Sequence, residues 1–329
     1  MRVLVTGASG MLGRGTARTL SARGHDVTVL QRRPSGLDVR EVLGDIADPD
    51  AVRRAVRGQD AVVHLAAKVD VVGLWADFER ANVDGTRTVI EACRSLGTAR
   101  LVYVSSPSVA HAGQPLVGAG AGPADPAHAR GHYARSKALA EQMALGADGP
   151  SLAVLAVRPH LVWGPGDTQL VARLVARAAA GRLPVLGSGA ALIDTTYVDN
   201  AVDALVAAVD RCGPAHGTAV VVSNGEPRPV AEIIARVCRA AGVPAPSRRV
   251  PARLGRLAGT ACDRVWAVTG RQDIPPVTRF LAEQLTTAHW FDQRRTRETL
   301  RWAPAIGLDE GFRRLASSYL SADADTGSS

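Results

Sequence analysis

The sequence predicts an α/β fold: a Rossmann-type doubly wound parallel sheet with a smaller, discontinuous C-terminal domain. Through the first half of the chain, short runs rich in β-branched residues alternate with amphipathic helical stretches, a pattern typical of βαβ units. A glycine-rich turn joins the first apolar run to the first helical stretch. Beyond residue 158 the alternation becomes irregular, which indicates a second unit inserted into and following the first.

Five strands and four helices are predicted in the first half. The strands are short and apolar, and they are Arg2–Thr6, Asp26–Leu30, Ala61–Leu65, Leu101–Ser105 and Ala153–Arg158. The helices carry apolar residues at helical spacing, and they are Met11–Ala22, Ala51–Arg57, Asn82–Ser95 and Tyr133–Leu145. The stretch His111–Gly131 is rich in Gly, Pro and Ala and is predicted to be a loop, which at that length is usually functional.

The second half is predicted to contain further helices at Leu170–Ala180, Val230–Ala241, Arg253–Val268 and Thr278–Leu285. Two runs, Asp194–Val198 and Thr218–Ser223, are expected to return to the sheet as strands. We therefore expect residues 1–162 and 192–226 to form the nucleotide-binding domain and residues 163–191 and 227–320 to form the substrate domain. The polar residues 321–329 are expected to be a disordered tail.

The composition favours an ordinary globular protein, because 46% of the 329 residues are hydrophobic and 21% are charged. The net charge of +8 comes from scattered arginines, and aromatic residues make up only 4% of the chain, so we expect no nucleic-acid binding. The cysteines are far apart, which favours reduced thiols over disulfides; they are Cys93, Cys212, Cys238 and Cys262. The histidines have no metal-ligand spacing, so no metal is expected.

The N-terminus offers no room for a signal peptide, because an apolar strand begins at Val3. No apolar run reaches 18 residues, and the longest, Leu254–Val268, is interrupted by charges. We therefore expect a cytoplasmic protein without a transmembrane segment.

The first turn has the spacing of a dinucleotide-binding loop. Gly7 permits the tight turn, Gly10 lets the backbone approach a pyrophosphate, and Gly13 allows the helix to pack closely. The helix N-terminus then favours phosphate charge. The residues expected to line the cofactor here are Gly7, Ser9, Gly10, Met11, Leu12 and Gly13.

The end of the second strand favours NADPH over NADH. An NAD-binding fold usually carries an acid there to bind the ribose 2′-hydroxyl, whereas this chain has Gln31, Arg32 and Arg33. A carboxylate would repel a 2′-phosphate, and two arginines would bind one through charge-assisted hydrogen bonds. The alternative is that arginines are merely common in this chain, but the missing acid is the stronger observation.

Lysine is rare in the chain: only Lys68 and Lys137 occur among 39 basic residues. Lys137 lies four residues after Tyr133, on the same face of a predicted helix. An ammonium beside the tyrosine hydroxyl favours the phenolate and lowers a pKa that is ordinarily about 10, which suits general acid–base chemistry. A Tyr-x-x-x-Lys spacing is common in helices, so this pair does not decide the function by itself.

Several further motifs follow the glycine-rich turn: Gly44-Asp45-Ile46, His64-Leu65-Ala66-Ala67-Lys68, Asn82-Val83-Asp84-Gly85-Thr86, Tyr103-Val104-Ser105-Ser106 and Arg158-Pro159-His160-Leu161. They occur in the order found in the extended short-chain dehydrogenases/reductases, and the chain resembles that family over nearly its whole length. The resemblance implies that Ser106, Tyr133 and Lys137 are catalytic. It also implies cofactor contacts from Asp45, Ile46, Leu65, Ala66, Ala67, Lys68, Asn82, Ser105, Tyr133, Lys137, Pro159, His160 and Leu161.

Within the family the chain is similar to the 3β-hydroxysteroid dehydrogenase-like branch, especially to bacterial 2-alkyl-3-oxoalkanoate reductases of olefin biosynthesis. The similar segments extend from Arg158–Asp167 through Asp194–Asn200 and Ser223–Pro227 to Thr278–Leu285. The resemblance implies NADPH-dependent reduction of an apolar ketone or β-keto acid, with Tyr133 as the proton donor. The segments His111–Gly131 and Val69–Asp77 look particular to this chain and are expected to shape substrate choice.

Other functions remain open at this level. A 3β-hydroxysteroid or sterol dehydrogenase would use the same catalytic residues, a nucleotide-sugar epimerase would retain NAD, and a non-enzymatic NADPH sensor could share the fold. The resemblance also implies a homodimer formed through Asn82–Ser95 and Tyr133–Leu145. Lys68 fits a cofactor ribose, a substrate carboxylate or a solvated rim equally well. The substrate domain offers an apolar set that fits core packing, an acyl chain or a peripheral membrane contact: Leu254, Leu257, Val265, Trp266, Val268, Phe280 and Leu281.

Overall fold

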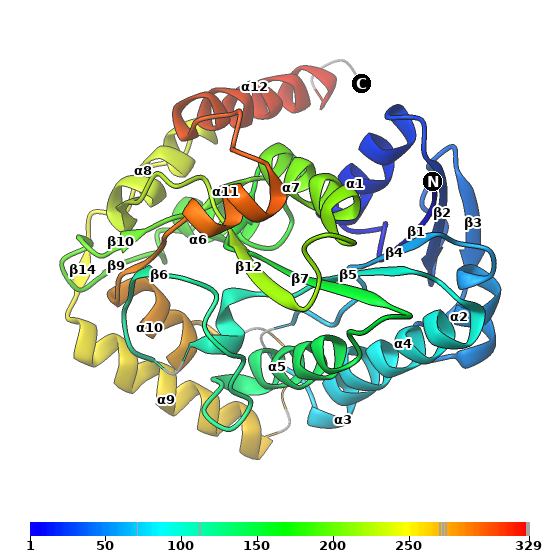
Figure 1. Ribbon diagram of the computed structural model, residues 1–329. Helices are drawn as coiled ribbons and strands as arrows, with labels where there is room; N and C mark the ends of the chain where they lie inside the picture. The colour runs from blue at the N-terminus through cyan, green and yellow to red at the C-terminus, as the bar shows by residue number, and fades with distance from the viewer. Residues whose placement is uncertain (71, 112, 270, 272, 274, 327–329) are drawn as a thin grey trace.

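The computed structural model describes residues 1–329 except 71, 112, 270, 272, 274 and 327–329. Its main layer is a parallel seven-stranded sheet in the order β12-β7-β5-β4-β1-β2-β3 (Figure 1). The strands are β1 (Arg2–Thr6), β2 (Asp26–Gln31), β3 (Arg40–Leu43), β4 (Ala61–His64), β5 (Arg100–Val104), β7 (Ala153–Pro159) and β12 (Thr218–Val222). The Rossmann-type fold expected from the sequence is thereby confirmed.

The central strands are buried on both faces, as a parallel sheet requires. In β1 every residue after Arg2 is buried or nearly so, and Val3 pairs with Val27 on one side and with Ala61 on the other. The five strands predicted in the first half are confirmed to within one residue at each end. The additional strand β3 is half exposed at the edge of the sheet, which explains its weaker apolar pattern.

Helices cover both faces of this sheet (Figure 1). One face carries α1 (Met11–Ala22) and α7 (Val198–Arg211), and the other carries α2 (Pro49–Val56), α4 (Gly85–Leu96) and α5 (Gly131–Gly146). Asp48 caps α2 by accepting from the Asp50 N–H, and Gly97 ends α4 in a left-handed conformation. The predicted helix at Asn82 begins earlier, because α3 (Trp75–Phe78) and the π-helical η1 (Glu79–Asp84) lead directly into α4.

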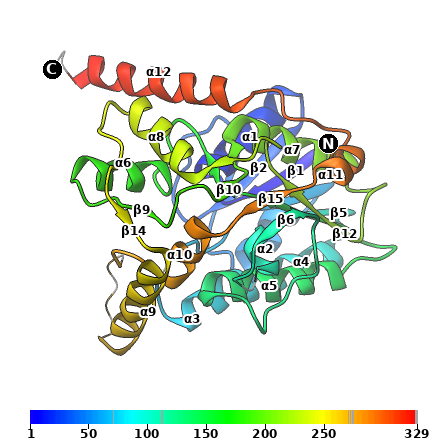
Figure 2. The ribbon, with the colours of Figure 1, turned by 90° about the vertical axis from the view of Figure 1, so that its left-hand side faces the viewer.

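The remaining elements form a second, smaller group at one side of the molecule (Figures 1 and 2). Its four-stranded sheet has the order β13-β10-β15-β6. Its strands are β6 (Leu116–Ala119), β10 (Leu192–Ile193), β13 (Arg228–Pro229) and β15 (His289–Phe291). Two further two-stranded sheets are present: β8 (Val162–Trp163) pairs with β11 (Thr196–Tyr197), and β9 (Val185–Leu186) pairs with β14 (Arg249–Val250). The helices are α6 (Val171–Ala179), α8 (Val230–Ala240), α9 (Ala252–Thr269) and α10 (Arg279–Thr286).

The prediction that Asp194–Val198 returns to the main sheet is wrong, whereas Thr218–Ser223 does return, as β12 beside β7. The first segment instead crosses the carboxyl end of the sheet, where Thr196 pairs with Val162 of β8. The Thr196 hydroxyl is hydrogen-bonded to the carbonyls of His160 (2.7 Å) and Val222 (3.0 Å), contacts that a strand pattern does not reveal. The chain then enters α7, a helix that the sequence reading missed.

The predicted loop His111–Gly131 also differs from expectation, because it contributes β6 to the second sheet. Strand β6 pairs with β15, which lies far along the chain, so no local pattern could indicate the pairing. A short 3₁₀ helix, η2 (Pro107–Ala110), immediately precedes the loop.

The C-terminal part packs back on the nucleotide-binding half. Helix α11 (Arg294–Leu300), which the domain prediction assigns to the substrate domain, packs against α7 and β12. Phe312 stacks on Trp163 with ring centroids 4.5 Å apart. The predicted disordered tail is helical at its start, since α12 (Leu308–Thr326) continues through it, while residues 327–329 lie outside the described residues.

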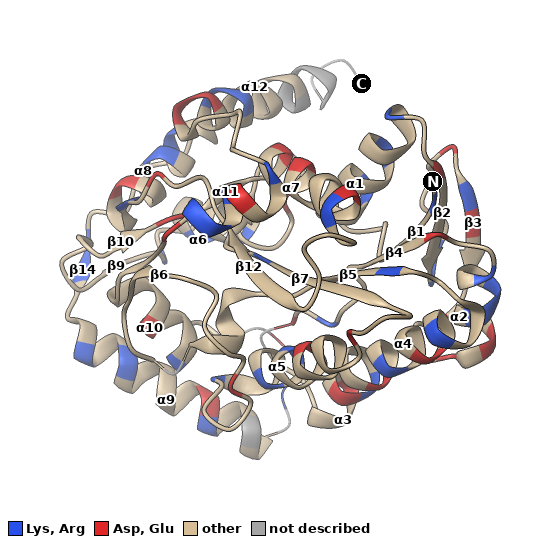
Figure 3. Cartoon of the chain, in the orientation of Figure 1, with Lys and Arg blue, Asp and Glu red and all other residues tan. Residues whose placement is uncertain are grey.

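Charged residues of both signs are mixed along the chain: basic residues on β3, α8, α9 and α12 are interspersed with acidic ones (Figure 3). Within the described residues no helix is both long and apolar enough to cross a membrane. The described part of the chain also contains no cluster of three or more His, Cys, Asp or Glu side chains arranged to hold a metal ion. All four cysteines are free thiols, and Cys93, Cys212 and Cys238 are buried.

Candidate active site

A cavity of about 1040 Å³ lies at the carboxyl ends of the parallel strands. In an open α/β sheet this is where ligands bind, at the point where the strand order reverses, here between β1 and β4. It is lined by almost all of the site residues predicted from the sequence: Gly7, Ser9, Gly10, Met11, Leu12, Gly13, Gln31, Arg32, Asp45, Ile46, Leu65, Ala66, Ala67, Lys68, Ser105, Ser106, Tyr133, Lys137, Pro159, His160 and Leu161. Arg33 and Asn82 do not line it.

The glycine loop shows why its three glycines are spaced as they are. Gly7 has a φ of +77°, and a Cβ there would lie 2.9 Å from the Ala66 backbone. A Cβ on Gly13 would lie 2.4 Å from the Gly7 carbonyl oxygen, so this glycine allows α1 to pack against the turn. Gly10 differs, because a Cβ there would meet only the Gly7 oxygen at 3.7 Å. Gly10 is therefore the glycine that leaves room on the cavity side, at the N-terminus of α1.

The end of β2 lacks an acid that is free to face the cavity. Gln31 is buried and donates to Glu41 of β3 at 2.6 Å, and the Ser35 N–H donates to the same carboxylate oxygen at 2.8 Å. The Ser35 contact is the main reason that the pKa of Glu41 lies below its usual value. Glu41 does not line the cavity, whereas the exposed Arg32 does; Arg33 is also exposed but does not line the cavity.

The turn after β3 is fixed by local contacts. The Asp45 carboxylate accepts from the Ala47 N–H at 2.9 Å and pairs with Arg80 at 3.2 Å. The Ile46 side chain fills the space beside Gly85, where an added Cβ would lie 2.8 Å from it. These contacts hold Asp45 and Ile46 at the cavity wall.

The segment after β4 is held by buried side chains. Thr6 accepts from the N–H groups of Leu65 (3.1 Å) and Ala66 (3.0 Å). The buried Asn82 accepts from the Lys68 N–H at 2.7 Å and donates to the Lys68 carbonyl at 3.1 Å and to Ser136 at 2.8 Å. Asn82 does not itself line the cavity, but it holds the Lys68 backbone in the cavity wall and links that segment to α5.

The side chain of Lys68, the second lysine, lies at the cavity rim. Its ammonium pairs with Asp70 at 2.9 Å and Asp77 at 4.0 Å, and it lies 5.4 Å from the Phe78 ring centroid. Because two carboxylates share one ammonium, the group formed by Lys68, Asp70 and Asp77 has a net negative charge.

The three predicted catalytic side chains converge on the cavity from β5 and α5. Ser106 follows β5, and its hydroxyl oxygen accepts from the Ser108 hydroxyl at 3.0 Å. Burial raises the pKa of Tyr133, and hydrogen bonding with Ser106 opposes that shift. Ser106 rather than Ser105 therefore interacts with the tyrosine. Ser105 also lines the cavity, with its buried hydroxyl unpaired among the described residues.

The expected pairing of Lys137 with Tyr133 differs from the observed one. The Lys137 ammonium donates to the Val104 carbonyl at 2.7 Å and lies 4.2 Å from the Tyr103 ring centroid. Burial lowers its pKa from 10.5 to about 7, and the nearby Glu141 carboxylate opposes this. The expected lowering of the Tyr133 pKa is thus not found, because burial raises that pKa and the lysine ammonium has turned to a backbone carbonyl.

A buried ion pair between Glu141 and Arg158 lies next to Lys137, because Glu141 is one helical turn after Lys137 on α5. Glu141 and Arg158 are both almost fully buried, and the Arg158 Nε donates to Glu141 Oε2 at 2.9 Å with a second, shorter contact beside it. The guanidinium also donates to the Gly122 carbonyl at 2.7 Å. This arrangement ties α5, β7 and the loop before α5 together beneath the catalytic residues.

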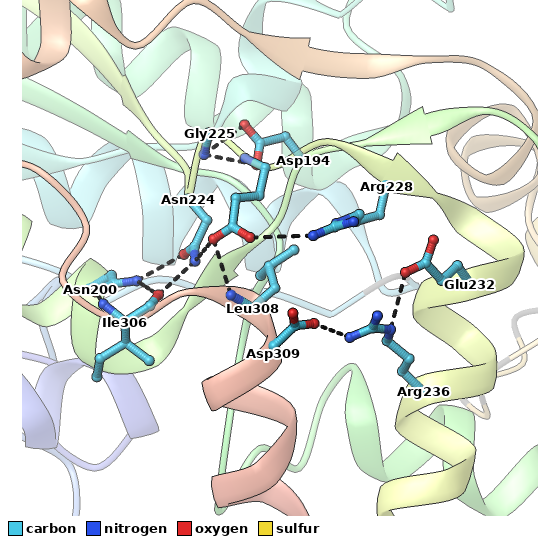
Figure 4. Close-up of polar contacts among 11 residues, drawn as sticks. Asp194, Asn200, Asn224, Gly225, Arg228, Glu232, Arg236, Ile306, Leu308 and Asp309 are labelled. Carbon is cyan, nitrogen blue, oxygen red and sulfur yellow. Dashed lines mark hydrogen bonds and ion pairs between the residues drawn. The ribbon is translucent and has the colours of Figure 1, made fainter.

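The segment after β7 is fixed through Asp194. Leu161 has a φ of +42°, and His160 contacts the Asp194 carbonyl through Nδ1. The Asp194 carboxylate is buried and accepts from the Ser223 hydroxyl at 2.6 Å. It also accepts from the Gly225 N–H at 3.1 Å (Figure 4). Burial raises its pKa to about 6.

The start of α12 is joined to the same region. Asn200 and Asn224 both donate to the Ile306 carbonyl, at 2.7 and 2.8 Å, and Glu226 accepts from the Leu308 N–H at 3.1 Å (Figure 4). Arg236 of α8 bridges Glu232 and Asp309 on the outer side. The C-terminal helix is therefore anchored to the turn that supports His160.

The far end of the cavity contains residues that the sequence reading missed or misplaced. His111, Leu116, Leu285 and His289 line it, and none carries a local motif. Of the predicted apolar set, Phe280 and Leu281 of α10 line the cavity, whereas Leu254, Leu257, Val265 and Val268 of α9 are exposed. Of the alternatives left open for this set, core packing is excluded for these four α9 residues, because α9 turns that side to solvent.

The chain matches the sequence model of the NAD dependent epimerase/dehydratase family over residues 3–223. It is 42% identical to a 2-alkyl-3-oxoalkanoate reductase of Stenotrophomonas maltophilia over 97% of the chain and 99% of that protein. It is 36% identical to another of Shewanella oneidensis, over 95% and 85%. Among solved structures, MoeE5 in complex with UDP-glucose and NAD superposes with a TM-score of 0.74 and 26% identity, covering 98% of this chain and 99% of MoeE5.

These relatives support a nicotinamide cofactor and oxidoreductase activity on alcohol and ketone groups. The fold, the glycine loop and the Ser106–Tyr133–Lys137 cluster agree with that conclusion. The chain therefore belongs to the NAD dependent epimerase/dehydratase family of extended short-chain dehydrogenases/reductases.

Proposed function

We propose that this protein is an NADPH-dependent ketoreductase that reduces an apolar β-keto acid to the corresponding secondary alcohol. The observation that carries the proposal is the convergence of Ser106, Tyr133 and Lys137 on one cavity that also receives the glycine loop. The substrate class is supported by relatives named 2-alkyl-3-oxoalkanoate reductases, which match the chain over nearly its full length. Apolar side chains at the far end of the cavity, including Phe280 and Leu285, suit alkyl chains.

The cavity residues fit a dinucleotide. Gly10 leaves open space at the N-terminus of α1, and no side chain caps that helix end, so its first N–H groups can bind phosphate oxygens. Arg32 lies at the end of β2, where a 2′-phosphate would be bound. Glu41, the acid on the neighbouring strand, is already engaged by Gln31 and Ser35. These contacts support NADPH over NADH.

The nicotinamide, when bound, supplies the hydride. Tyr133 holds the proton that the reduced ketone needs, because burial raises the pKa of its phenol and keeps it protonated at neutral pH. The Ser106 hydroxyl lies at the end of β5 beside Tyr133 and stabilises the ketone oxygen as negative charge develops on it. The Lys137 ammonium, held at the same cavity by Val104, offsets the charge left on Tyr133 after proton transfer.

Substitution of the tyrosine tests the mechanism. Tyr133→Phe should abolish NADPH oxidation with a 2-alkyl-3-oxoalkanoate while leaving NADPH affinity, measured by fluorescence titration, nearly unchanged. Tyr319→Phe on α12, outside the cavity, is the matched control and should behave like the wild type. Turnover by Tyr133→Phe at the wild-type rate would refute the assignment.

A second experiment tests the cofactor and the competing functions. Steady-state rates should favour NADPH over NADH, and Arg32→Ala should reduce that preference by about tenfold or more, since a charge-assisted contact is lost. Arg18→Ala, an exposed α1 arginine away from the cavity, serves as the control. A marked preference for a 3β-hydroxysteroid with NAD would favour a steroid dehydrogenase instead. Tightly retained NAD without NADPH oxidation would favour an epimerase.

We further propose that the protein is a homodimer formed through α4 and α5. These helices lie side by side on the same face of the sheet, next to the catalytic residues (Figure 1). Sedimentation velocity at micromolar concentration should give the mass of two chains, and a monomer would overturn the proposal.

A further inference from the structure

Helix α9, at the edge of the molecule, presents its apolar side to solvent (Figures 1 and 2). Four of its large apolar residues are 48% to 88% exposed, and they are Leu254, Leu257, Val265 and Val268. The exposed Ala261 lies between them at helical spacing, so all five share one side of the helix and form the apolar stripe. A contiguous apolar surface typically marks a contact with another molecule or with a membrane.

The opposite side of α9 fixes this orientation. Gly255 and Gly259 are buried there, and a Cβ on Gly259 would lie 2.6 Å from the backbone nitrogen of Arg279 in α10. A Cβ on Gly255 would lie 3.1 Å from the Leu186 side chain. Because a glycine side is needed at such close approach, a rotation that turned the leucines inward would drive their side chains into the α10 backbone. The packing of α9 therefore forces the apolar stripe outward.

The charge around the apolar stripe is positive. Residues 248–286 contain seven arginines and three acids. Asp263, the only acid of α9, accepts from the Arg279 N–H at 3.0 Å, and the other two, Asp273 and Glu283, each pair with an arginine of the same segment at 2.8 Å. The arginines of the segment without an acid partner among the described residues are all exposed, and they are Arg248, Arg249, Arg253, Arg256 and Arg264.

These charges discriminate between the partners that could cover the apolar stripe. A second copy of the chain, docked with twofold symmetry, would place the five unpaired arginines opposite the same five arginines, which repel each other. An anionic lipid surface suits both features of α9. Its headgroups attract the arginines, while the apolar side chains enter the boundary between headgroups and acyl chains, as in helices that lie in the plane of a membrane interface.

We propose that α9 docks this protein on an anionic lipid surface, with the apolar stripe in the interface and the arginines of residues 248–264 facing the lipid phosphates. The inference goes beyond the proposed reaction and does not depend on it. Helix α10 packs on the inner side of α9 and supplies Phe280 and Leu281 to the cavity wall. Docking therefore brings lipid next to the helix that forms the apolar end of the cavity.

Flotation of the full chain with lipid vesicles tests the contact, at about 0.1 M salt, where the Debye length is about 10 Å. Vesicles of equal parts phosphatidylcholine and phosphatidylglycerol should carry the protein upward in the gradient. Vesicles of phosphatidylcholine alone should bind it at least about tenfold more weakly, because each arginine near an anionic surface contributes about fivefold.

The apolar contribution is tested by the double variant Leu254→Ser with Leu257→Ser. Its binding to the anionic vesicles should fall about tenfold or more, because two leucines no longer enter the lipid. Leu320→Ser is the matched control, since Leu320 is 72% exposed on α12, away from the apolar stripe, and this variant should bind like the wild type.

The basic contribution is tested by the double variant Arg253→Gln with Arg256→Gln. Binding to the anionic vesicles should fall about tenfold or more, and the loss should shrink at high salt because screening already weakens the wild type. Arg18→Gln, at an exposed arginine of α1, is the control and should bind like the wild type.

Equal binding to the two kinds of vesicle, or wild-type binding by either double variant, would overturn the proposal. Sedimentation velocity without vesicles tests the other occupant: if the double serine variant has half the mass of the wild type, the apolar stripe joins two copies and the lipid contact is wrong. Should the serine variant unfold at a lower temperature, the glutamine variant supplies the same test. Flotation uses no substrate, so lipid binding without ketone reduction would refute the proposed function alone.

Discussion

Removing the charge of Glu141 should destabilise the protein more than any comparable surface change. Glu141 is fully buried in α5 and accepts twice from the equally buried Arg158 of β7. Glu141→Gln keeps the size of the side chain but leaves the guanidinium without its counter-charge. A buried charge that loses its partner typically costs 3–5 kcal/mol, so we expect a loss of about 4 kcal/mol in the free energy of unfolding.

The remaining contact of Arg158 limits that loss but does not prevent it. Its guanidinium still donates to the Gly122 carbonyl at 2.7 Å, a neutral acceptor that cannot replace a carboxylate. The same substitution removes the charge that raises the pKa of Lys137, so that pKa should fall below its value of about 7. Stability and the pH dependence of turnover should therefore change together.

Urea denaturation measures the stability change. Asp60→Asn breaks the exposed ion pair with Arg2 and is the matched control, which should lose little because solvent screens it. The double variant Glu141→Leu with Arg158→Met removes both charges and should recover much of the loss. The reasoning is refuted if Glu141→Gln changes the unfolding free energy no more than Asp60→Asn does.

Three further outcomes follow from the same structure. Gly13→Ala places a methyl group against the Gly7 carbonyl and should lower the free energy of unfolding, measured by urea denaturation, by about 1–3 kcal/mol. Gly10→Ala should unfold nearly like the wild type but bind NADPH more weakly. Similar stabilities for the two variants would contradict the packing. Because the lowered pKa of Lys137 is about 7, its ammonium is present below that pH, so kcat/KM for NADPH should fall as the pH rises above 7; a flat profile to pH 9 would exclude this role. Asn82→Ala removes the contacts to Lys68 and should raise the NADPH dissociation constant about tenfold with a smaller effect on kcat, while an unchanged constant would show that the cavity wall holds without it.

Much of the nucleotide-binding half could be predicted because its signals are local. Buried strands such as Arg2–Thr6 are short apolar runs, and helices such as Met11–Ala22 repeat at helical spacing. The glycines of the first turn are required by close backbone approaches that depend on only a few neighbouring residues, so their spacing is readable directly. The segment Asp194–Val198 was misread because its buried polar side chains are satisfied by distant partners.

The sequence by itself determined the family and the parallel sheet, and it predicted Ser106, Tyr133 and Lys137 as the candidate catalytic residues, because each belongs to a short motif with a fixed place on a strand end or a helix. Only the tertiary structure decided what surrounds them. It turned the Lys137 ammonium to Val104, buried the Tyr133 phenol, and joined β6 to β15 so that His111 meets His289. These outcomes depend on burial and on contacts between distant segments, and neither quantity is encoded in the spacing of neighbouring residues.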